Sequence, residues 1–241
     1  MILAIVFVAT LIRSAFGFGE ALIAVPLLAL CMPIQIAAPL AVLVSITIAA
    51  VVVIQDWRHI HVRSAGWLIF STLFGIPLGL LLLTHSPEHL VKGLLGGLIL
   101  LFAVFCLFGK LRLQLHHDSR AWMLTCGFVA GILGGAYGMN GPPLVIYGTM
   151  RNWTAQHFRA TLQAYFLPAS MLGMCGYLGA GLWTRTVTND YLLCLPVMFP
   201  AVFLGRAINH RLSADMFARY IYGGLAAIGL ALMAGSFVHI R

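Results

Sequence analysis

The chain has 241 residues, of which 61% are apolar and 8% are charged, and its mean hydropathy is +1.00. A soluble domain of this size needs far more charge to cover its surface, so the composition excludes that class. Apolar stretches long enough to cross a bilayer recur along the chain, and lipid can accommodate their backbone polar groups only within helices. The composition therefore predicts an all-α polytopic membrane protein surrounded by lipid.

The net charge of +8 and the five cysteines predict no further partner or cofactor. The cations stand in short loops, one to three at a time, as the positive-inside rule expects, so no nucleic acid is predicted to bind. The cysteines are scattered through apolar segments without a Cys-x-x-Cys or Cys/His cluster, so no metal site is expected. The sequence leaves the oligomeric state open, and a homo-oligomer is compatible with it.

Eight apolar segments follow one another along the chain, each long enough to span a bilayer. They are predicted at residues 1–31, 34–55, 64–84, 89–109, 121–150, 155–182, 190–209 and 215–238. The longest polar stretch, near residues 110–120, is a loop and leaves no room for a soluble domain.

The first and fifth segments are both interrupted by glycine, and they mark a repeat of about 121 residues. When residues 14–25 are set over residues 135–146, Gly17 falls on Gly138. Further along, residues 96–97 fall on 223–224, again as a pair of glycines. The chain is therefore predicted to be one transmembrane domain made of a first repeat, residues 1–119, and a second repeat, residues 120–241.

Counting cations tests whether the two glycine-broken segments cross the membrane. If all eight segments cross, the loop cations divide seven to six between the two sides, without bias. If segments one and five turn back at their glycines, the division is ten to three, which the positive-inside rule favours. The ten are Arg58, Arg63, Lys110, Arg112, Arg120, Arg151, Arg159, Arg206, Arg211 and Arg219, and the three are Lys92, Arg185 and Arg241.

Each half is therefore predicted to be a re-entrant, glycine-broken hairpin plus three transmembrane helices, with the second half inverted relative to the first. Both termini then lie on the periplasmic side of a bacterial inner membrane. A kinked segment that crosses completely is the alternative. Inverted repeats with broken helices are a recurrent design in secondary transporters.

At these two segments, residues 17–27 and 131–143, the sequence resembles the sulfite exporter TauE/SafE family. Ala160 and Thr161 match an Ala-Thr element that follows the second glycine motif. The resemblance implies a secondary transporter that exports a small sulfur-containing anion, such as sulfite, sulfoacetate or another organosulfonate. An importer or channel of the same fold for another small anion is the alternative.

An intramembrane enzyme is not expected. Such enzymes need a nucleophile with a base, or paired acids, inside the bilayer. The aspartates stand at predicted helix ends or in loops, and no histidine occupies the centre of a predicted helix. The aspartates are Asp56, Asp118, Asp190 and Asp215.

The backbone at the two breaks is the predicted anion site. A helix that starts inside the membrane points free N–H groups and a positive dipole end at its ligand, and glycine lets the backbone approach it. The residues predicted to bind substrate in this way are Gly17, Phe18, Gly19, Gly138, Met139, Asn140 and Gly141. The competing interpretation is that the glycines only allow close helix packing.

Arg13 and Glu20 are the two charges within the first glycine-broken segment. Arg13 could bind the anion, pair with Glu20, or extend its charge towards the membrane surface. Glu20 would repel a bound anion when ionised, so it is a candidate proton carrier whose neutralisation accompanies anion binding.

Several neutral polar side chains near the breaks are further candidates. Tyr137 and Asn140 could donate hydrogen bonds to substrate oxygens. Thr161 and Gln163 follow the second break, and Ser45 is similarly placed after the first. These could line the path, although hydroxyl groups often bond back to their own helix.

Overall fold

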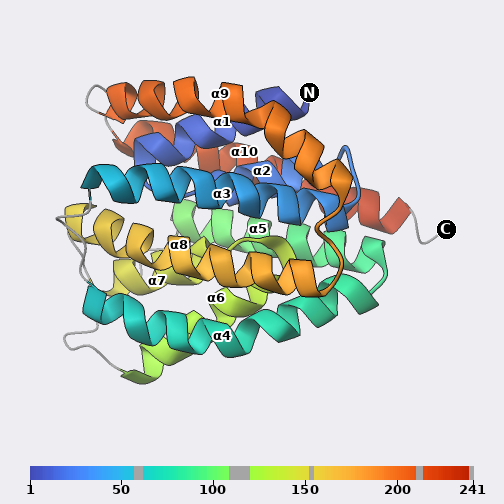
Figure 1. Cartoon of the computed structure of the whole chain (residues 1–241), viewed down its shortest axis with the longest axis horizontal. Helices are drawn as coiled ribbons and strands as arrows, with labels where there is room; N and C mark the ends of the chain where they lie inside the picture. The colour runs from blue at the N-terminus through green and yellow to red at the C-terminus, as the bar shows by residue number, and fades with distance from the viewer. Residues whose placement is uncertain (57–61, 109–119, 152–154, 210–213, 239–241) are drawn as a thin grey trace.

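A computed structural model describes residues 1–56, 62–108, 120–151, 155–209 and 214–238, and these residues form helices and their connections, as predicted. Figure 1 shows the helices packed side by side with their axes running in broadly the same direction. They are α1 Ile2–Phe16, α2 Glu20–Ala29, α3 Ile34–Asp56, α4 Val62–His85, α5 Glu88–Phe108, α6 Arg120–Tyr137, α7 Gly141–Met150, α8 Ala155–Gly179, α9 Arg185–Asn209 and α10 Ala214–Val238.

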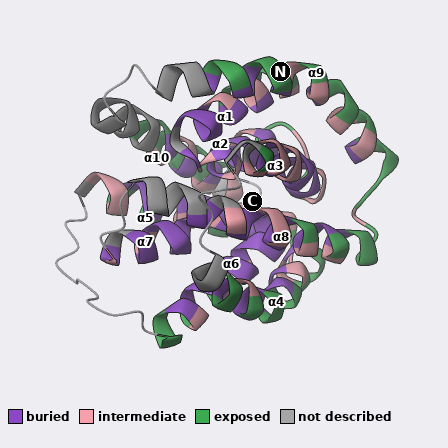
Figure 2. Cartoon of the chain, turned by 60° about the vertical axis from the view of Figure 1, so that its left-hand side comes forward, coloured by how far each residue is buried: buried purple, intermediate pink, exposed green. Residues whose placement is uncertain are grey.

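Several of these helices have the length and composition of membrane spans. Within the described residues, four contain a sufficiently long apolar stretch: Ile34–Val51, Gly66–His85, Glu88–Leu107 and Arg185–Gly205. The outward sides of α4 and α9 carry large exposed apolar side chains, among them Phe70, Phe74, Phe199 and Phe203. Figure 2 shows exposed residues along these two helices, and buried residues concentrated in α2, α6 and α7. A helix that is apolar on both its inner and outer faces fits a lipid surround.

The two glycine-broken segments are each divided into two helices. α1 ends at Phe16 and α2 begins at Glu20, while α6 ends at Tyr137 and α7 begins at Gly141. Both breaks therefore fall at the same place in the two halves, at the offset of about 121 residues found in the sequence.

One predicted boundary differs clearly from the structure. α9 begins at Arg185, earlier than the predicted start at residue 190. The N–H of Val187 donates to Thr184 Oγ1 at 3.4 Å, and the N–H of Thr188 donates to the Thr184 carbonyl at 3.1 Å. Thr184 therefore caps the helix, and a threonine before a polar first turn is the signal for this start.

Each broken segment doubles back on itself. The sulfur atoms of Cys31 and Met1 lie 3.5 Å apart, so the chain leaves the first hairpin beside the point where it entered. In the second hairpin, Leu144 and Tyr147 of α7 share a buried cluster with Met123 of α6, which places them near the end where α6 began.

The helix ends near both termini gather at one end of the bundle. Leu30 after α2, Glu88 at the start of α5 and Ser236 near the end of α10 line one hollow at the surface. Ser236 Oγ donates to the carbonyl of His89. Figure 1 shows the N-terminus and the end of α10 towards the same side of the molecule.

The closest helix pairs join the two halves of the chain. α1 packs against α9, α6 against α4, α3 against α8, and α5 against α10. In the repeat predicted from the sequence, α1 corresponds to α6 and α9 to α4, so the first two pairs are the ones that such a repeat makes equivalent. Each hairpin therefore packs its first helix against the second of the three long helices in the other half.

Glycines set the spacing of these pairs. A Cβ atom on Gly75 would lie 2.2 Å from the Phe128 carbonyl oxygen, and one on Gly79 would lie 2.1 Å from that of Ile132. The order of these contacts makes α4 and α6 parallel. In α5 and α10, by contrast, Gly96 lies against Gly229 while His89 contacts Ser236, so these helices are antiparallel. Small residues that let helix backbones approach closely are typical of membrane interfaces.

Candidate functional site: a cavity between two helix breaks

The backbone at both breaks adopts conformations that favour glycine. Gly17 and Gly19 have φ of 83° and 97°, and Gly138 has φ of 67°. These left-handed values cost other residues roughly 1 kcal/mol or more. At Gly138 space is also limiting, because a Cβ atom would lie 2.6 Å from Val42 Cγ2. The glycine motif of the sequence is therefore explained by the turns between the half-helices.

The two breaks face each other across a small cavity. It is lined by residues 18–22 of the first break and residues 138–142 of the second, together with Arg13, Ser45, Phe166 and Ser170. α2 starts at Glu20 and α7 at Gly141, so the N-terminal ends of two helices point at this cavity. Helix N-termini carry partial positive charge and unpaired N–H groups, which suit an anion.

The cavity is narrow as it stands. Its volume of about 20 Å³ has room for roughly one water molecule. A larger oxyanion fits only if a lining side chain moves.

Arg13 and Glu20 form a buried ion pair at the cavity wall. Arg13 Nη1 pairs with Glu20 Oε2 and also donates to Ser45 Oγ at 2.5 Å. The guanidinium carbon lies 5.2 Å from the centre of the Phe166 ring, a favourable cation–π distance. Arg13 is 3% exposed and Glu20 is 1% exposed. Arg13 therefore does not extend to a membrane surface, and its pairing with Glu20 is confirmed, while binding of an anion stays a prediction.

Polar oxygens around the ion pair include buried ones without a hydrogen bond. Within the described residues these include Glu20 Oε1 and Asn140 Oδ1 at the cavity, and Ser14 Oγ one residue after Arg13. Asn140 precedes α7 directly, and its amide packs so closely on Gly134 that a Cβ atom there would lie 1.9 Å from Oδ1. Buried polar atoms without partners are uncommon, and the carboxylate and amide oxygens among these accept hydrogen bonds, so they point to an ordered water or another donor at this place.

Six of the predicted backbone residues are brought to the cavity wall: Phe18, Gly19, Gly138, Met139, Asn140 and Gly141. Gly17 forms part of the same break, where its N–H donates to the Arg13 carbonyl, but it does not line the cavity. The structure thus brings together two motifs that lie far apart in the sequence.

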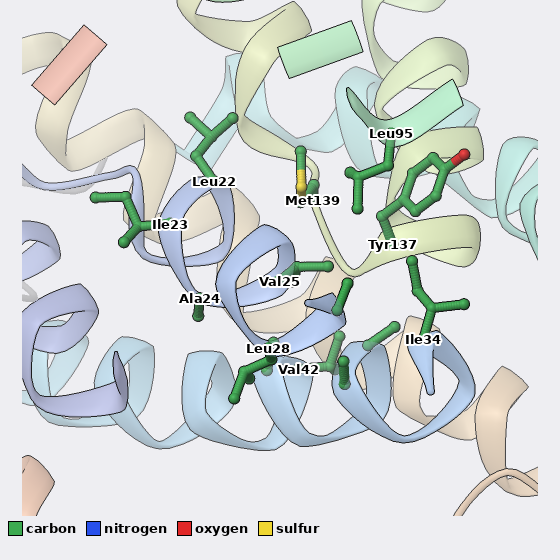
Figure 3. Close-up of a cluster of buried hydrophobic side chains, with 14 of the residues drawn as sticks. Leu22, Ile23, Ala24, Val25, Leu28, Ile34, Val42, Leu95, Tyr137 and Met139 are labelled. Carbon is green, nitrogen blue, oxygen red and sulfur yellow. The ribbon is translucent and has the colours of Figure 1, made fainter. Parts of the chain in front are cut away.

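The remaining predicted residues lie elsewhere. The Tyr137 hydroxyl donates to the Val91 carbonyl at 3.0 Å, and Figure 3 shows its ring beside Leu95 with the oxygen directed away from α2. Thr161 is buried, its Oγ1 has no partner in the described structure, and it does not line the cavity. The side chain of Gln163 lies outside the described residues.

Phe166 and Ser170 of α8 belong to the cavity but were not predicted. They are four residues apart and share one helix face. The sequence signal is weak, because α8 is apolar on several sides and its packing between α3 and α4 decides which face meets the cavity.

Comparisons with known proteins agree with the resemblance seen in the glycine motifs. Residues 2–232 match the family described as Sulfite exporter TauE/SafE. A protein of Cupriavidus necator described as a probable sulfite/organosulfonate exporter TauE is 26% identical over 178 residues, which cover 74% of this chain and 68% of that protein. No solved structure matches the chain.

Proposed function

Because the chain belongs to the sulfite exporter TauE/SafE family, we propose that it is a secondary transporter that exports a small sulfur-containing anion across the cytoplasmic membrane. Sulfite, sulfoacetate and other organosulfonates are the proposed substrates. The observation that carries the proposal is the pair of helix N-termini that face one cavity containing Arg13.

Family and helix composition together make the chain a multi-pass membrane transporter. Membership of a transporter family implies a small anionic substrate and a transport role in place of catalysis. The identity of the anion and the direction of transport are the finer parts of the proposal.

Two helix breaks supply what an anion needs inside a membrane. The backbone N–H groups at the starts of α2 and α7 offer hydrogen bonds and positive partial charge from opposite directions. Substrate would be held between them, near the bilayer midplane, by the backbone of residues 18–19 and 138–141. Asn140 would add a side-chain amide.

The two hairpins are proposed to be re-entrant. α2 and α7 have ten residues each, about half the length needed to cross a bilayer. The contact between Met1 and Cys31 further supports entry and exit on one side. An inverted repeat would place corresponding helices antiparallel, and the antiparallel packing of α5 on α10 agrees with it.

The orientation follows from the cations. Arg63, Arg120, Arg159, Arg206 and Arg219 fall in the end turns of helices at the end of the bundle opposite to Met1, and Arg151 follows α7 there. Arg58, Lys110, Arg112 and Arg211, and Arg241 from the smaller group, lie outside the described residues. Lys92 and Arg185 belong to the end that holds Met1. The positive-inside rule then puts both termini in the periplasm of a bacterial cell.

Flux measurements on the purified protein in proteoliposomes test the function. Vesicles loaded with sulfite or sulfoacetate should release the anion when the protein is present, and Gly138→Ala should abolish release because of its φ and its contact with Val42. Gly173→Ala is the matched control, since its Cβ atom would meet nothing within 4 Å. Release of neither anion by a folded protein would overturn the substrate class.

Flux measurements on the same vesicles distinguish an exporter from an importer and from a channel. An imposed pH gradient should change the rate if Glu20 carries a proton, and an unchanged rate removes that role. Uptake against a gradient would indicate an importer, and flux that never saturates with concentration would indicate a channel.

A further inference from the structure

We propose that Glu20 is a built-in competitor of the transported anion: its carboxylate holds Arg13 when the site is empty, and the anion binds by displacing it. The inference rests on the proposed function, because it takes the cavity between the two breaks as the anion site. It assigns a specific exchange to two residues whose roles the sequence left open.

The contacts of Arg13 provide the first argument. Its Nη1 is shared by Glu20 and Ser45, and the face of its guanidinium is covered by Phe166. Arginine binds carboxylates and sulfur oxyanions through the same N–H groups. Glu20 therefore occupies an edge of Arg13 that a bound anion would use.

The size of the cavity provides the second argument. Its volume of about 20 Å³ has room for roughly one water molecule. A sulfite ion or sulfonate head group has one sulfur and three oxygen atoms and does not fit there beside the Glu20 carboxylate. Withdrawal of that three-atom group from Arg13 frees space next to the existing cavity, on the side of the cation.

The charges around Glu20 provide the third argument. Among the described residues that line the cavity, Arg13 of α1 is the cation that faces Glu20, and the groups from α3, the second break and α8 are neutral: Ser45, Asn140, Phe166 and Ser170. On α5, Glu88, His89 and Lys92 lie near Leu30 at the far end of α2. A carboxylate that loses Arg13 has no second cation in the cavity.

An unpaired carboxylate in a buried site next to a bound anion is costly, so displacement favours its protonation. Binding one anion is then accompanied by uptake of about one proton by Glu20, and the two move together. The Arg13–Glu20 pair re-forms when the anion leaves and the proton is lost.

Calorimetric titration of the wild-type protein with methanesulfonate tests this exchange directly. The sulfonate group stays ionised across the neutral range, so proton uptake measured by comparing two buffers comes from the protein. The expected result is uptake of about one proton per anion bound at neutral pH. Binding without proton uptake would overturn the exchange.

Glu20→Gln removes the competing charge. It should bind methanesulfonate roughly ten- to a hundredfold more tightly than wild type, the range expected for one charge-assisted hydrogen bond, and without proton uptake. Glu88→Gln is the matched control, because Glu88 also pairs with a cation, Lys92, but at an exposed site. The control should behave like wild type, and unchanged affinity of Glu20→Gln would contradict the proposal.

Glu20→Ala leaves the space of the carboxylate unfilled. Acetate should then compete with methanesulfonate for Arg13, whereas in wild type acetate should not, because the site already holds a carboxylate. Equal competition by acetate in both proteins would overturn the competitor role.

The double variant Arg13→Gln/Glu20→Gln is the control for misfolding, because it leaves no unpaired charge at the site. It should fold and lose methanesulfonate binding, and wild-type binding by this variant would refute the role of Arg13. If wild type binds and transports sulfur anions but shows no exchange, only this inference fails. If folded wild type neither binds nor transports them, the proposed function itself fails.

Discussion

The Arg13–Glu20 pair combines two charges that are both almost fully buried. Burial of one ion without a partner costs several kcal/mol, and breaking a buried pair at one end typically destabilises by about 3–5 kcal/mol. Replacing both partners by neutral groups costs much less, because no charge is left alone. The ion pair therefore stabilises the first hairpin only while both charges are present, and either charge alone destabilises it.

Arg13→Gln should accordingly be less stable than Arg13→Gln/Glu20→Gln, by about 3 kcal/mol. Lys92→Gln gives the comparison, because Lys92 is 25% and Glu88 41% exposed at the side chain, and exposed pairs contribute about 0–1 kcal/mol. Thermal unfolding in detergent measures the differences. Equal stability of the single and double variants would mean that loss of Arg13 leaves no penalty at Glu20, which would contradict the buried ion pair.

A substitution at Tyr137 tests whether this residue binds substrate or only stabilises the fold. Its hydroxyl donates to the Val91 carbonyl, so Tyr137→Phe should lower stability by about 1 kcal/mol and leave the KM for sulfite unchanged. A raised KM with unchanged stability would instead restore Tyr137 as a substrate ligand. Anion flux and thermal unfolding on the same preparation decide between them.

At the scale of the helices, glycine is required only where two helix backbones approach closely. α5 and α10 meet at Gly96, where a Cβ atom would lie 2.7 Å from the Gly229 carbonyl oxygen and 2.9 Å from Met233 Cγ. The neighbouring Gly97 meets nothing within 4 Å. Two adjacent glycines therefore have opposite roles, although the sequence pairs both with glycines of the second half.

Gly96→Ala should destabilise the protein by about 1–3 kcal/mol through overpacking, and Gly97→Ala should be neutral or stabilising by up to about 1 kcal/mol because alanine favours helix. Unfolding temperature measured side by side checks both. A loss of stability in Gly97→Ala of the same size would show that α5 packs differently.

The sequence predicted the helices and the two helix breaks better than it predicted which side chains meet in the folded protein. Both helix breaks were predicted because a positive φ and a close backbone approach require glycine, a signal that is local. The contact of Arg13 with Phe166 is not local, since α8 joins the cavity through packing and not through any motif. The direction of the Tyr137 hydroxyl depends on the rotation of α6 about its axis, which a glycine-rich helix with several apolar faces does not specify.

For the molecule as a whole, the two topologies differ in whether the glycine-broken segments turn back within the membrane or cross it completely. If the first hairpin is re-entrant, the N-terminus and Cys31 lie on the same side of the membrane; a full crossing separates them. In intact cells, a membrane-impermeant maleimide should label Cys31, which is exposed. In the variant Arg120→Cys, whose position is also exposed, the new thiol should react only after permeabilisation.

The labelling uses variants that retain one cysteine each, with an N-terminal epitope tag read by antibody on the same cells. An accessible tag combined with an inaccessible Cys31 would show that the first segment crosses the bilayer.

The packing of α1 against α9 has a consequence for biosynthesis. α1 precedes α9 by more than 150 residues in the chain, so the first hairpin leaves the ribosome and enters the bilayer before its main partner exists. A lone arginine at that depth would be expensive in lipid. Because Glu20 belongs to the same hairpin, the nascent chain carries its own counter-ion and can insert as an electrically neutral unit while the rest of the protein is still being translated.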